Sequence, residues 1–372
     1  MTMAKESVDF TTLFTAQVVE RSLVAETLCR RGQQLFADAG LLSETGAYAL
    51  ATPGKLLRPL LLLDACRATG GDPERVFPAA LGTEFGHIAS LIHDDIIDGD
   101  DERRGRPTLH RQFDTGAAIL TGDALIFSTF LSYTGCLERG VSAERTVGAI
   151  RLLSETCIEM CRGQALEAAL QRDLHASKAR YLEVIRLKTA VFCRAVTYLG
   201  AYLGGADEAQ CALLGEYGLR LGMAFQLMDD VLCYADADDA NDANDADDSD
   251  QHDGQGGDTA DTLGKSQLSD LCNQRVTLPI IYAWDAGGPH ERRILRDAFT
   301  SDEDGGEDDP QRLLETHAAI KRVLRTTGAL ESTRALVHRY TVQAQRSLDP
   351  LPPSDAGMRL TLLAALLASR DH

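Results

Sequence analysis

The stretch RVFPAALGTEFGHIASLIHDDIID, residues 75–98, carries the clearest structural signal in the chain. Its apolar residues recur at helical spacing, which predicts one long helix that ends at the aspartates. Asp94 and Asp98 are four residues apart, so on a helix both carboxylates leave the same face, one turn apart. Apolar flanks place them at the rim of a core, where unpaired carboxylates are costly. The pair therefore indicates a cation such as Mg2+, which proteins commonly hold with one or two carboxylates and substrate phosphates.

Basic residues flank this aspartate pair on both sides. RRGRP at residues 103–107 follows it, and GKLLRP at residues 54–59 precedes it. Lys55 and Arg58 are three residues apart at the expected start of a helix, which suits a grip on one phosphate group. An acidic run alone is commonly a solvated helix end, but carboxylates beside fixed cations favour a site for a diphosphate that carries its own magnesium.

Further motifs resemble those of the trans-isoprenyl diphosphate synthase (polyprenyl synthetase) family. They occur in the family's order: GKLLRP at 54–59, HIASLIHDDIID at 87–98, RRGRPTLH at 103–110, TGDAL at 121–125, Lys188-Thr189, FQLMDD at 225–230, Gly264-Lys265 and RVTLP at 275–279. The resemblance implies an all-α fold, a single large helical bundle around a central cavity. It also implies a Mg2+-dependent prenyltransferase that condenses isopentenyl diphosphate with an allylic diphosphate.

Periodic apolar segments along the chain agree with an all-α fold. They are 56–69, 75–98, 116–138, 143–171, 178–203, 206–235, 310–326, 329–348 and 354–369. Strand-like alternation is hard to find, and Gly or Pro lies at most junctions. Since no linker separates two cores, we expect one domain over residues 1–372.

The net charge of −19 is concentrated in one segment. Residues 235–261 hold eleven aspartates and no bulky apolar side chain, so we predict a disordered acidic insertion at 236–261. The spacing of its aspartates lacks the glycine and glutamate placement of an EF-hand. An acidic chain also argues against nucleic acid as a partner.

The cysteines and the N-terminus bear on where the protein works. Nine cysteines are scattered singly without zinc-type pairs, as in a reducing cytosol. The first residues, MTMAKESVDFTTLF, lack the apolar core of a signal peptide. No apolar stretch looks long enough to span a bilayer. We therefore expect a cytoplasmic protein without stable membrane insertion.

The resemblance implies a role for each candidate site residue. The magnesium ligands would be Asp94 and Asp98 on one side of the allylic diphosphate and Asp229 on the other. The contacts to the allylic diphosphate would come from Arg103, Lys188 and Lys265. Isopentenyl diphosphate would be held without metal by Lys55, Arg58, His87 and Arg104. Oxygen dipoles near the allylic cation would come from Thr189 and Gln226. No protein base is required, because the released diphosphate can take the proton.

Structural alternatives stay open for several of these residues. A lysine in an apolar helix, such as Lys188, could simply extend its amine to the surface. His87 could be a core histidine, and Gln226 could buttress Asp229. Arg106 is better explained by loop packing than by ligand binding.

One position departs from the family pattern. The second aspartate motif usually has a third acid, and here that position is Cys233. A thiol is a poor magnesium ligand, which puts metal affinity on that side in doubt. Asp229, the first aspartate of the motif, is the one expected to bind metal directly.

Product length can be interpreted from the helix that carries Asp94. Steps of four residues back along it reach Ser90, Gly86 and Gly82, with Ala89 alongside, so small residues would line roughly 18 Å below the metals. Because no aromatic residue lies at positions 89 or 90, we expect a product longer than C15. A four-unit product remains an alternative, since Phe85 could close the pocket lower down.

The resemblance also implies a homodimer. Three alternatives to a synthase of polyprenyl diphosphates longer than C15 stay open. A geranylgeranyl diphosphate synthase would use the same chemistry. A class I terpene cyclase would also bind its diphosphate through metal-binding aspartates, but it does not need a second diphosphate-binding site. A non-catalytic subunit of a hetero-oligomeric synthase would be expected to lose its aspartates, and this chain keeps most of them.

Overall fold

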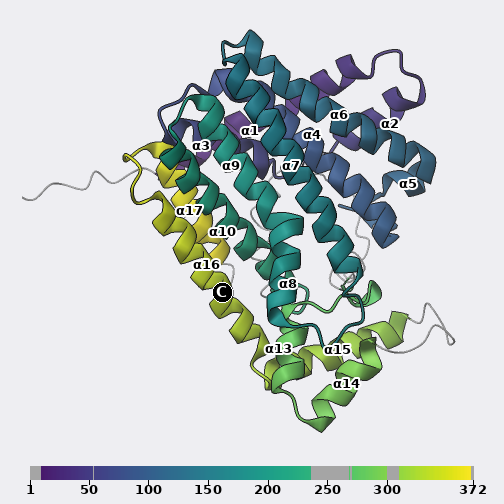
Figure 1. The fold of residues 1–372 in the computed structure, drawn as a ribbon. Coiled ribbons are helices and arrows are strands. Elements are labelled where there is room, and N and C mark those ends of the chain that lie inside the picture. The colour runs from purple at the N-terminus through teal and green to yellow at the C-terminus, as the bar shows by residue number, and fades with distance from the viewer. Residues whose placement is uncertain (1–9, 53, 236–267, 269, 300–309, 370–372) are drawn as a thin grey trace, which may run out of the picture. The chain divides into compact units, whose positions relative to one another are not determined.

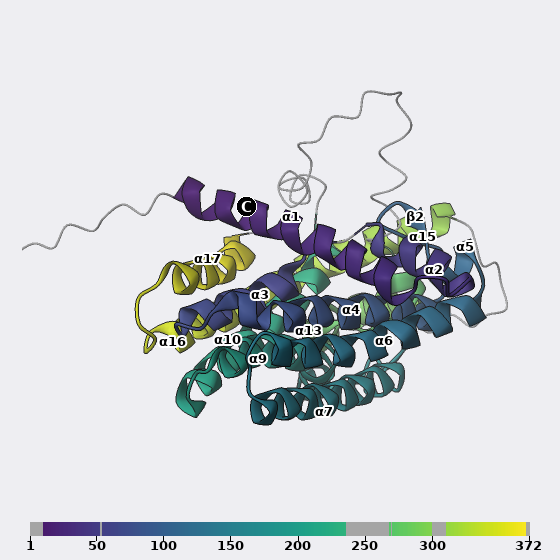
Figure 2. The ribbon, with the colours of Figure 1, turned by 90° about the horizontal axis from the view of Figure 1, so that it is seen from above.

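The computed structural model describes residues 10–52, 54–235, 268, 270–299 and 310–369. Helices dominate this part of the chain, which confirms the all-α prediction (Figure 1; Figure 2). The helices are α1 (Phe10–Leu35), α2 (Leu41–Leu50), α3 (Leu57–Ala68), α4 (Pro73–Asp98), α5 (Leu109–Gln112), α6 (Thr115–Glu138), α7 (Ala143–Ala168), α8 (Lys178–Ile185), α9 (Val191–Gly204), α10 (Glu208–Leu232), α13 (Leu278–Ala286), α14 (Pro289–Phe299), α15 (Pro310–Thr326), α16 (Ala329–Leu348) and α17 (Asp355–Ser369). A π-helical turn, Arg186–Ala190, joins α8 to α9. Two short strands, β1 (Glu102–Arg103) and β2 (Arg106–Pro107), form a hairpin.

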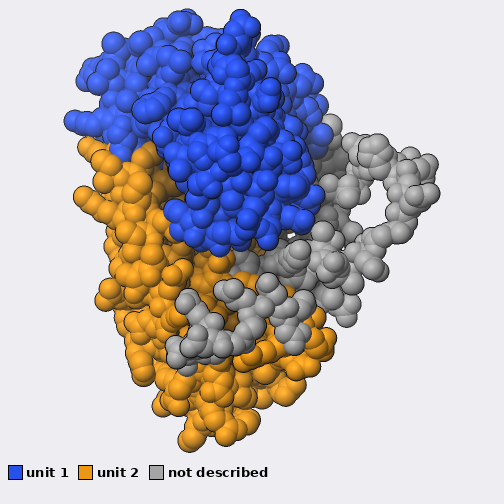
Figure 3. Space-filling view, turned by 90° about the vertical axis from the view of Figure 1, so that its right-hand side faces the viewer, with its two compact units in different colours: residues 1–154, 195–215, 348–361 blue, residues 155–194, 216–347, 362–372 orange. Residues whose placement is uncertain are grey.

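The chain falls into two compact units, which Figure 3 colours separately. Unit 1 comprises residues 1–154, 195–215 and 348–361, and unit 2 comprises residues 155–194, 216–347 and 362–372. The expected single domain over residues 1–372 stays a prediction. The predicted acidic insertion at 236–261 lies outside the described residues.

Helix α4 has well-defined ends within unit 1. The side chain of Asp72 accepts a hydrogen bond from the backbone N–H of Glu74 at 3.0 Å, and Pro73 occupies the first helical position. Both features favour a helix start. The helix ends directly after Asp98, where Gly99 adopts a left-handed conformation with φ of 70°. These ends place the predicted metal-binding aspartates in the last turn of the helix.

The face of α4 that carries the small residues packs against α6. A Cβ atom at Gly82 would lie 2.8 Å from the carbonyl oxygen of Thr129, and one at Gly86 would lie 3.2 Å from its Oγ1. Both glycines permit close approach of the two helices. Gly82 is buried, so our expectation that it lines an open wall below the metals is wrong, whereas Gly86 is partly exposed and the expectation for it stays a prediction. Ala89 is fully buried, whereas Ser90 is partly exposed.

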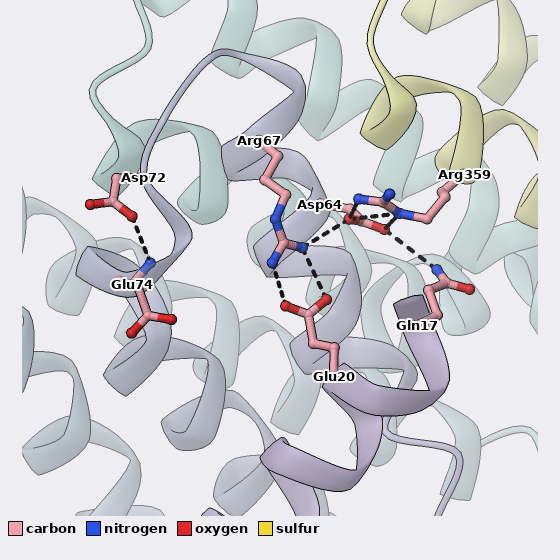
Figure 4. Close-up of polar contacts among 7 residues, drawn as sticks. All are labelled: Gln17, Glu20, Asp64, Arg67, Asp72, Glu74 and Arg359. Atoms are coloured by element: carbon pink, nitrogen blue, oxygen red, sulfur yellow. Dashed lines mark hydrogen bonds and ion pairs between the residues drawn. The ribbon is translucent and has the colours of Figure 1, made fainter. Parts of the chain in front are cut away.

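A buried ion network ties three segments of unit 1 together (Figure 4). Asp64 on α3 is only 3% exposed. It accepts hydrogen bonds from Nε of Arg359 at 3.1 and 3.0 Å, from Nη1 of Arg67 at 3.2 Å and from Nε2 of Gln17 at 3.5 Å. Arg67 also donates to Glu20 at 2.9 Å. A buried carboxylate is costly unless such partners compensate its charge. Since the partners of Asp64 come from different helices, the network links α1, α3 and the start of α17.

Unit 2 is organised around an extensive apolar core. The core combines side chains of α8 and α10 with those of the helices from α13 to α16. Its members include the aromatic residues Tyr181, Tyr234, Trp284 and Phe299. The π-helical turn contributes Ala190, so this core also positions the segment that carries the predicted catalytic residues Lys188 and Thr189.

Helix α6 corrects one expectation from the sequence. In the described part of the chain, it is the one helix that is long and apolar enough to cross a membrane by length and composition. Our expectation that no apolar stretch reaches this length is therefore wrong. However, 44% of its most apolar window is buried by the chain itself. A core helix of a globular protein has the same properties.

Candidate functional site

The three aspartates at the end of α4 do not share one environment. Asp94 and Asp98 are partly exposed, as expected for residues that bind a ligand from solvent. Asp95 is buried and accepts a hydrogen bond from Nε of Arg103 at 2.6 Å. Burial raises the pKa of Asp95, although the Arg103 guanidinium opposes this. Arg103, predicted to contact the allylic diphosphate, is thus anchored at the end of the helix that carries the predicted metal ligands.

The basic motif after α4 forms a tight hairpin. Arg104 and Gly105 make a two-residue loop with φ of 53° and 69°, as in a type I′ turn. Nη1 of Arg104 donates to the carbonyl oxygen of Thr52 at 3.2 Å. Arg106 lies over the ring of Tyr48, 4.1 Å from its centroid, and also donates to the Thr52 hydroxyl. The packing of Arg106 agrees with its explanation as a loop residue.

Arg58 and His87 lie together in unit 1. Nη1 of Arg58 is 3.0 Å from Nε2 of His87. A guanidinium can only donate, so His87 accepts at Nε2 and carries its proton on Nδ1. Burial and the neighbouring arginines Arg58 and Arg104 lower the pKa of His87 well below its usual value, which keeps the ring neutral. Nδ1–H is then available to donate to a phosphate oxygen.

Lys55 is not on a helix with Arg58, in contrast to our expectation. Leu56 adopts a left-handed conformation with φ of 52°, and α3 begins only at Leu57. Lys55 is exposed and precedes the helix, whereas Arg58 lies in its first turn. The three-residue spacing therefore places the two cations less rigidly than a helix would.

Glu84 is a buried carboxyl that the sequence analysis missed. It is 2% exposed and lies one helical turn before His87 on α4. Its Oε2 atom has no hydrogen-bond partner among the described residues. Burial raises the pKa of Glu84 to about 7, while Arg58 and Arg104 oppose the shift. The three-residue spacing of Glu84 and His87 on an apolar helix is the signal that could have found it.

Replacing Glu84 with glutamine should change how stability depends on pH. The folded-state pKa of about 7 exceeds the ordinary value of 4.5, so the folded protein binds the proton more tightly and loses stability as pH rises through 7. At about 1.4 kcal/mol per pKa unit, Glu84→Gln should gain about 2–3 kcal/mol relative to the wild type between pH 5 and pH 8. Urea unfolding at both pH values measures this, and parallel losses in the two proteins would contradict it.

In unit 2, Lys188 and Thr189 lie on the π-helical turn. Such turns are rare and frequently mark functional sites. A Cβ atom at Gly163 of α7 would clash with the backbone nitrogen of Lys188, so only glycine allows this approach. Nζ of Lys188 pairs with Oε2 of Glu167 at 2.5 Å. Lys188 is therefore held by a carboxylate that the sequence did not point to, and it does not simply extend to the surface.

The adjacent aspartates of α10 face different surroundings. Asp229 is partly exposed, whereas Asp230 is 2% exposed. Asp230 accepts hydrogen bonds from the hydroxyl of Tyr181 at 2.5 Å and from Nε2 of Gln226 at 3.3 Å. Oε1 of Gln226 in turn accepts from the Thr189 hydroxyl at 3.0 Å. The structure thus brings Thr189 and Gln226 together, and the side-chain amide of Gln226 donates to Asp230, the neighbour of Asp229. Their role as oxygen dipoles near the allylic cation stays a prediction.

The remaining positions of the second motif give little support for a metal ligand. Burial and the nearby Asp270 raise the pKa of the Cys233 thiol well above its usual value. A protonated thiol does not bind magnesium. Lys265, the other predicted contact, lies outside the described residues.

The donor set fits magnesium that arrives with its substrate. Within the described ranges, no three acidic, histidine or cysteine side chains gather closely enough to hold a metal ion. Asp94 and Asp98 offer two carboxylates from one helix face. Mg2+ keeps waters and commonly takes its other ligands from substrate phosphates. These residues therefore suit a diphosphate-bound magnesium better than a permanent metal centre.

Comparison with known proteins gives a consistent result. The sequence model of the family described as polyprenyl synthetase matches residues 39–254. The chain is 32% identical to the geranylgeranyl diphosphate synthase of Methanosarcina mazei over 89% of this chain and 90% of that protein. It is 33% identical to heptaprenyl diphosphate synthase component 2 of Geobacillus stearothermophilus, over 90% and 92% of the two chains. A solved polyprenyl synthase from Caulobacter crescentus, complexed with calcium and isoprenyl diphosphate, is similar with a TM-score of 0.77 and 29% identity over 97% of both chains.

Proposed function

Because the chain belongs to the polyprenyl synthetase family, we propose that it condenses isopentenyl diphosphate with an allylic diphosphate to make a polyprenyl diphosphate longer than C15. The observation that carries this proposal is the pairing of Arg58 with His87, two helical turns before Asp94 on α4. This pairing supports a site that binds one diphosphate without metal. The nearby carboxylates of Asp94 and Asp98 suit a second diphosphate that is bound with metal. A terpene cyclase has only one diphosphate to bind.

The chemistry requires a highly charged group to leave. The C–O bond of the allylic diphosphate breaks, its electron pair leaves with the diphosphate, and an allylic cation remains. The double bond of isopentenyl diphosphate supplies the pair for the new C–C bond. A neighbouring C–H bond then gives up its proton to the released diphosphate and its electrons to a new double bond. Since negative charge develops on the diphosphate, catalysis should be mainly electrostatic.

The residues of this chain divide these tasks. As the family resemblance implies, Asp94, Asp98 and Asp229 would hold Mg2+, which would neutralise charge on the leaving diphosphate. The calcium in the Caulobacter crescentus structure supports a divalent cation in this family. Arg103 and Lys188 would bind the same diphosphate, together with Lys265. Lys55, Arg58, His87 and Arg104 would hold isopentenyl diphosphate.

Ser90 offers a direct test of product length. It lies one helical turn below Asp94 and is partly exposed, so a side chain there has access to space that the buried Gly82 does not have. Ser90→Phe should end elongation at about three or four isoprene units, because overfilling usually costs only about 1–3 kcal/mol and the fold should persist. Chromatography of the products measures this. Products of wild-type length would remove the support for a long-chain synthase.

One incubation separates the proposed function from its alternatives. Purified protein, Mg2+, labelled isopentenyl diphosphate and primers of different length should give labelled products longer than C15. Products that stop at four units would identify a geranylgeranyl diphosphate synthase. No product without a second protein would identify a subunit of a hetero-oligomer, as the name component 2 of one relative suggests for that protein.

We also propose a cytoplasmic homodimer without nucleic acid or stable membrane insertion. None of the nine cysteines, all of them among the described residues, forms a disulfide, which supports a reducing compartment such as the cytoplasm.

An apolar stripe on α6 supports the dimer. Leu120, Phe127 and Leu131 are 56%, 71% and 51% exposed, and their spacing of seven and four residues places them on one face of the helix. A second copy of the chain would cover this apolar stripe. A monomer in sedimentation at micromolar concentration would contradict the dimer.

A further inference from the structure

A continuous line of hydrogen bonds runs through unit 2 from a buried tyrosine to the predicted catalytic turn. The hydroxyl of Tyr181 donates to Oδ2 of Asp230 at 2.5 Å. Nε2 of Gln226 donates to Oδ1 of the same carboxyl at 3.3 Å, and Oε1 of Gln226 accepts from the Thr189 hydroxyl at 3.0 Å. Tyr181 and Asp230 are 8% and 2% exposed, so neither side chain can reach a ligand in solvent.

The line fixes the direction of each hydrogen bond. Oδ1 of Asp230 is an acceptor, so the Gln226 amide must turn its NH2 group toward it and its oxygen toward Thr189. The Thr189 hydroxyl then donates its only proton to Oε1 of Gln226. The two lone pairs of its oxygen then remain as acceptors, and Thr189 becomes an oriented acceptor.

The surrounding helices hold the two ends of the line in place. Tyr181 lies on α8, and the π-helical turn with Thr189 follows α8 directly. Gly163 of α7 and Gly222 of α10 allow close approach to this turn, because a Cβ atom at either would meet its backbone. The line therefore connects elements that packing has already made rigid. Networks of this kind orient a reacting group better than a single contact can.

We propose that Tyr181 is a positioning residue for the transfer reaction, acting through Asp230 and Gln226 to hold the Thr189 hydroxyl as an acceptor toward the developing positive charge of the allylic group. This inference rests on the proposed function. It assigns Asp230 to the orientation of Gln226 and leaves Asp229 as the metal-binding member of the pair. The cost of losing Tyr181 should therefore appear in the rate of reaction more than in substrate binding.

A double-mutant cycle tests the connection between Tyr181 and Thr189. Wild type, Tyr181→Phe, Thr189→Val and the double variant are compared in kcat and in KM for each substrate. We expect Tyr181→Phe to lower kcat about tenfold and to leave KM for isopentenyl diphosphate within about twofold. In the Thr189→Val background, the same change should have almost no further effect on kcat, since coupled residues are not additive.

A matched control separates positioning from simple loss of a buried hydroxyl. Tyr133 is fully buried in unit 1, and its hydroxyl lies 2.9 Å from that of Thr83. Tyr133→Phe should lower the melting temperature to a similar extent and leave kcat unchanged. If Tyr181→Phe does not fold, Asp230→Asn replaces it in the cycle, because an asparagine cannot accept from both neighbours through two carboxylate oxygens.

The outcomes distinguish the inference from the proposed function. If the wild type forms no prenyl product, the proposed function fails and the inference falls with it. If the wild type is active but the losses in kcat multiply, Tyr181 does not act through Thr189 and only the inference is overturned. Equal losses of kcat in Tyr133→Phe and Tyr181→Phe would overturn it as well. A tenfold loss that disappears in the Thr189→Val background would support it.

Discussion

Replacing Asp94 or Asp98 with alanine should lower kcat by about 10³-fold while the protein stays folded. Each carboxylate is partly exposed at the end of α4, so its loss leaves no cavity in a core. Each also contributes charge that would hold Mg2+ against the leaving diphosphate, and the barrier to ionisation depends on that ion. Initial rates at saturating Mg2+ and both substrates measure the loss, and circular dichroism reports whether the helices persist.

Asp101 provides a matched control for these variants. It lies three residues beyond Asp98, its side chain is 69% exposed, and it pairs with Arg111 at 2.5 Å. Exposed ion pairs of this kind contribute little to stability. Asp101→Ala removes the same charge from the same region, and we expect a rate close to that of the wild type. Near-wild-type rates in Asp94→Ala or Asp98→Ala would contradict the assigned metal role.

Replacing Asp64 with alanine should cost about 3–5 kcal/mol of folding free energy. The variant leaves the Arg359 guanidinium, 12% exposed, without the carboxylate that it contacts at 3.0 Å (Figure 4). A buried charge whose partner is removed loses the interaction and keeps the desolvation penalty. The midpoint of urea unfolding, followed by circular dichroism, measures the change, and kcat at low temperature should stay close to the wild type.

Asp72→Ala is the matched control for Asp64→Ala. It shows how much stability is lost when a different aspartate of unit 1 is removed. The Asp72 side chain caps α4 by accepting a hydrogen bond from the backbone N–H of Glu74 (Figure 4). Loss of a helix cap typically costs about 1 kcal/mol. We therefore expect Asp64→Ala to destabilise the protein several times more than Asp72→Ala. Equal losses would mean that the Asp64 network contributes no more than one exposed cap.

Much of the fold follows from helical periodicity. The pattern over 75–98 predicts α4 to within two residues, and the pattern over 329–348 matches α16. Periodicity does not reveal α1 and α2, or the short helices α13 and α14. Over Phe10–Leu35 the apolar residues are mixed with polar ones on all sides, so the segment shows little amphipathic pattern on its own. Its helix depends on packing against the rest of unit 1.

The site was less predictable where it depends on contacts between distant segments. Spacing along one helix places Asp94 and Asp98 on one face, but it cannot show that Asp95 turns inward to Arg103. The π-helical turn and the pairing of Lys188 with Glu167 require the close approach of α7 at Gly163. Gly82 shows the same limit, since a small residue suits either open space or a tight helix contact.

The most direct test of the proposed condensation is the ratio of diphosphate released to isopentenyl diphosphate consumed. Purified protein is incubated with Mg2+ and one allylic diphosphate, with and without isopentenyl diphosphate. We expect one diphosphate for each isopentenyl unit incorporated into the growing chain, and negligible release when isopentenyl diphosphate is left out. Rapid release of diphosphate without isopentenyl diphosphate, with a hydrocarbon or alcohol as the product, would contradict a chain-elongating prenyltransferase.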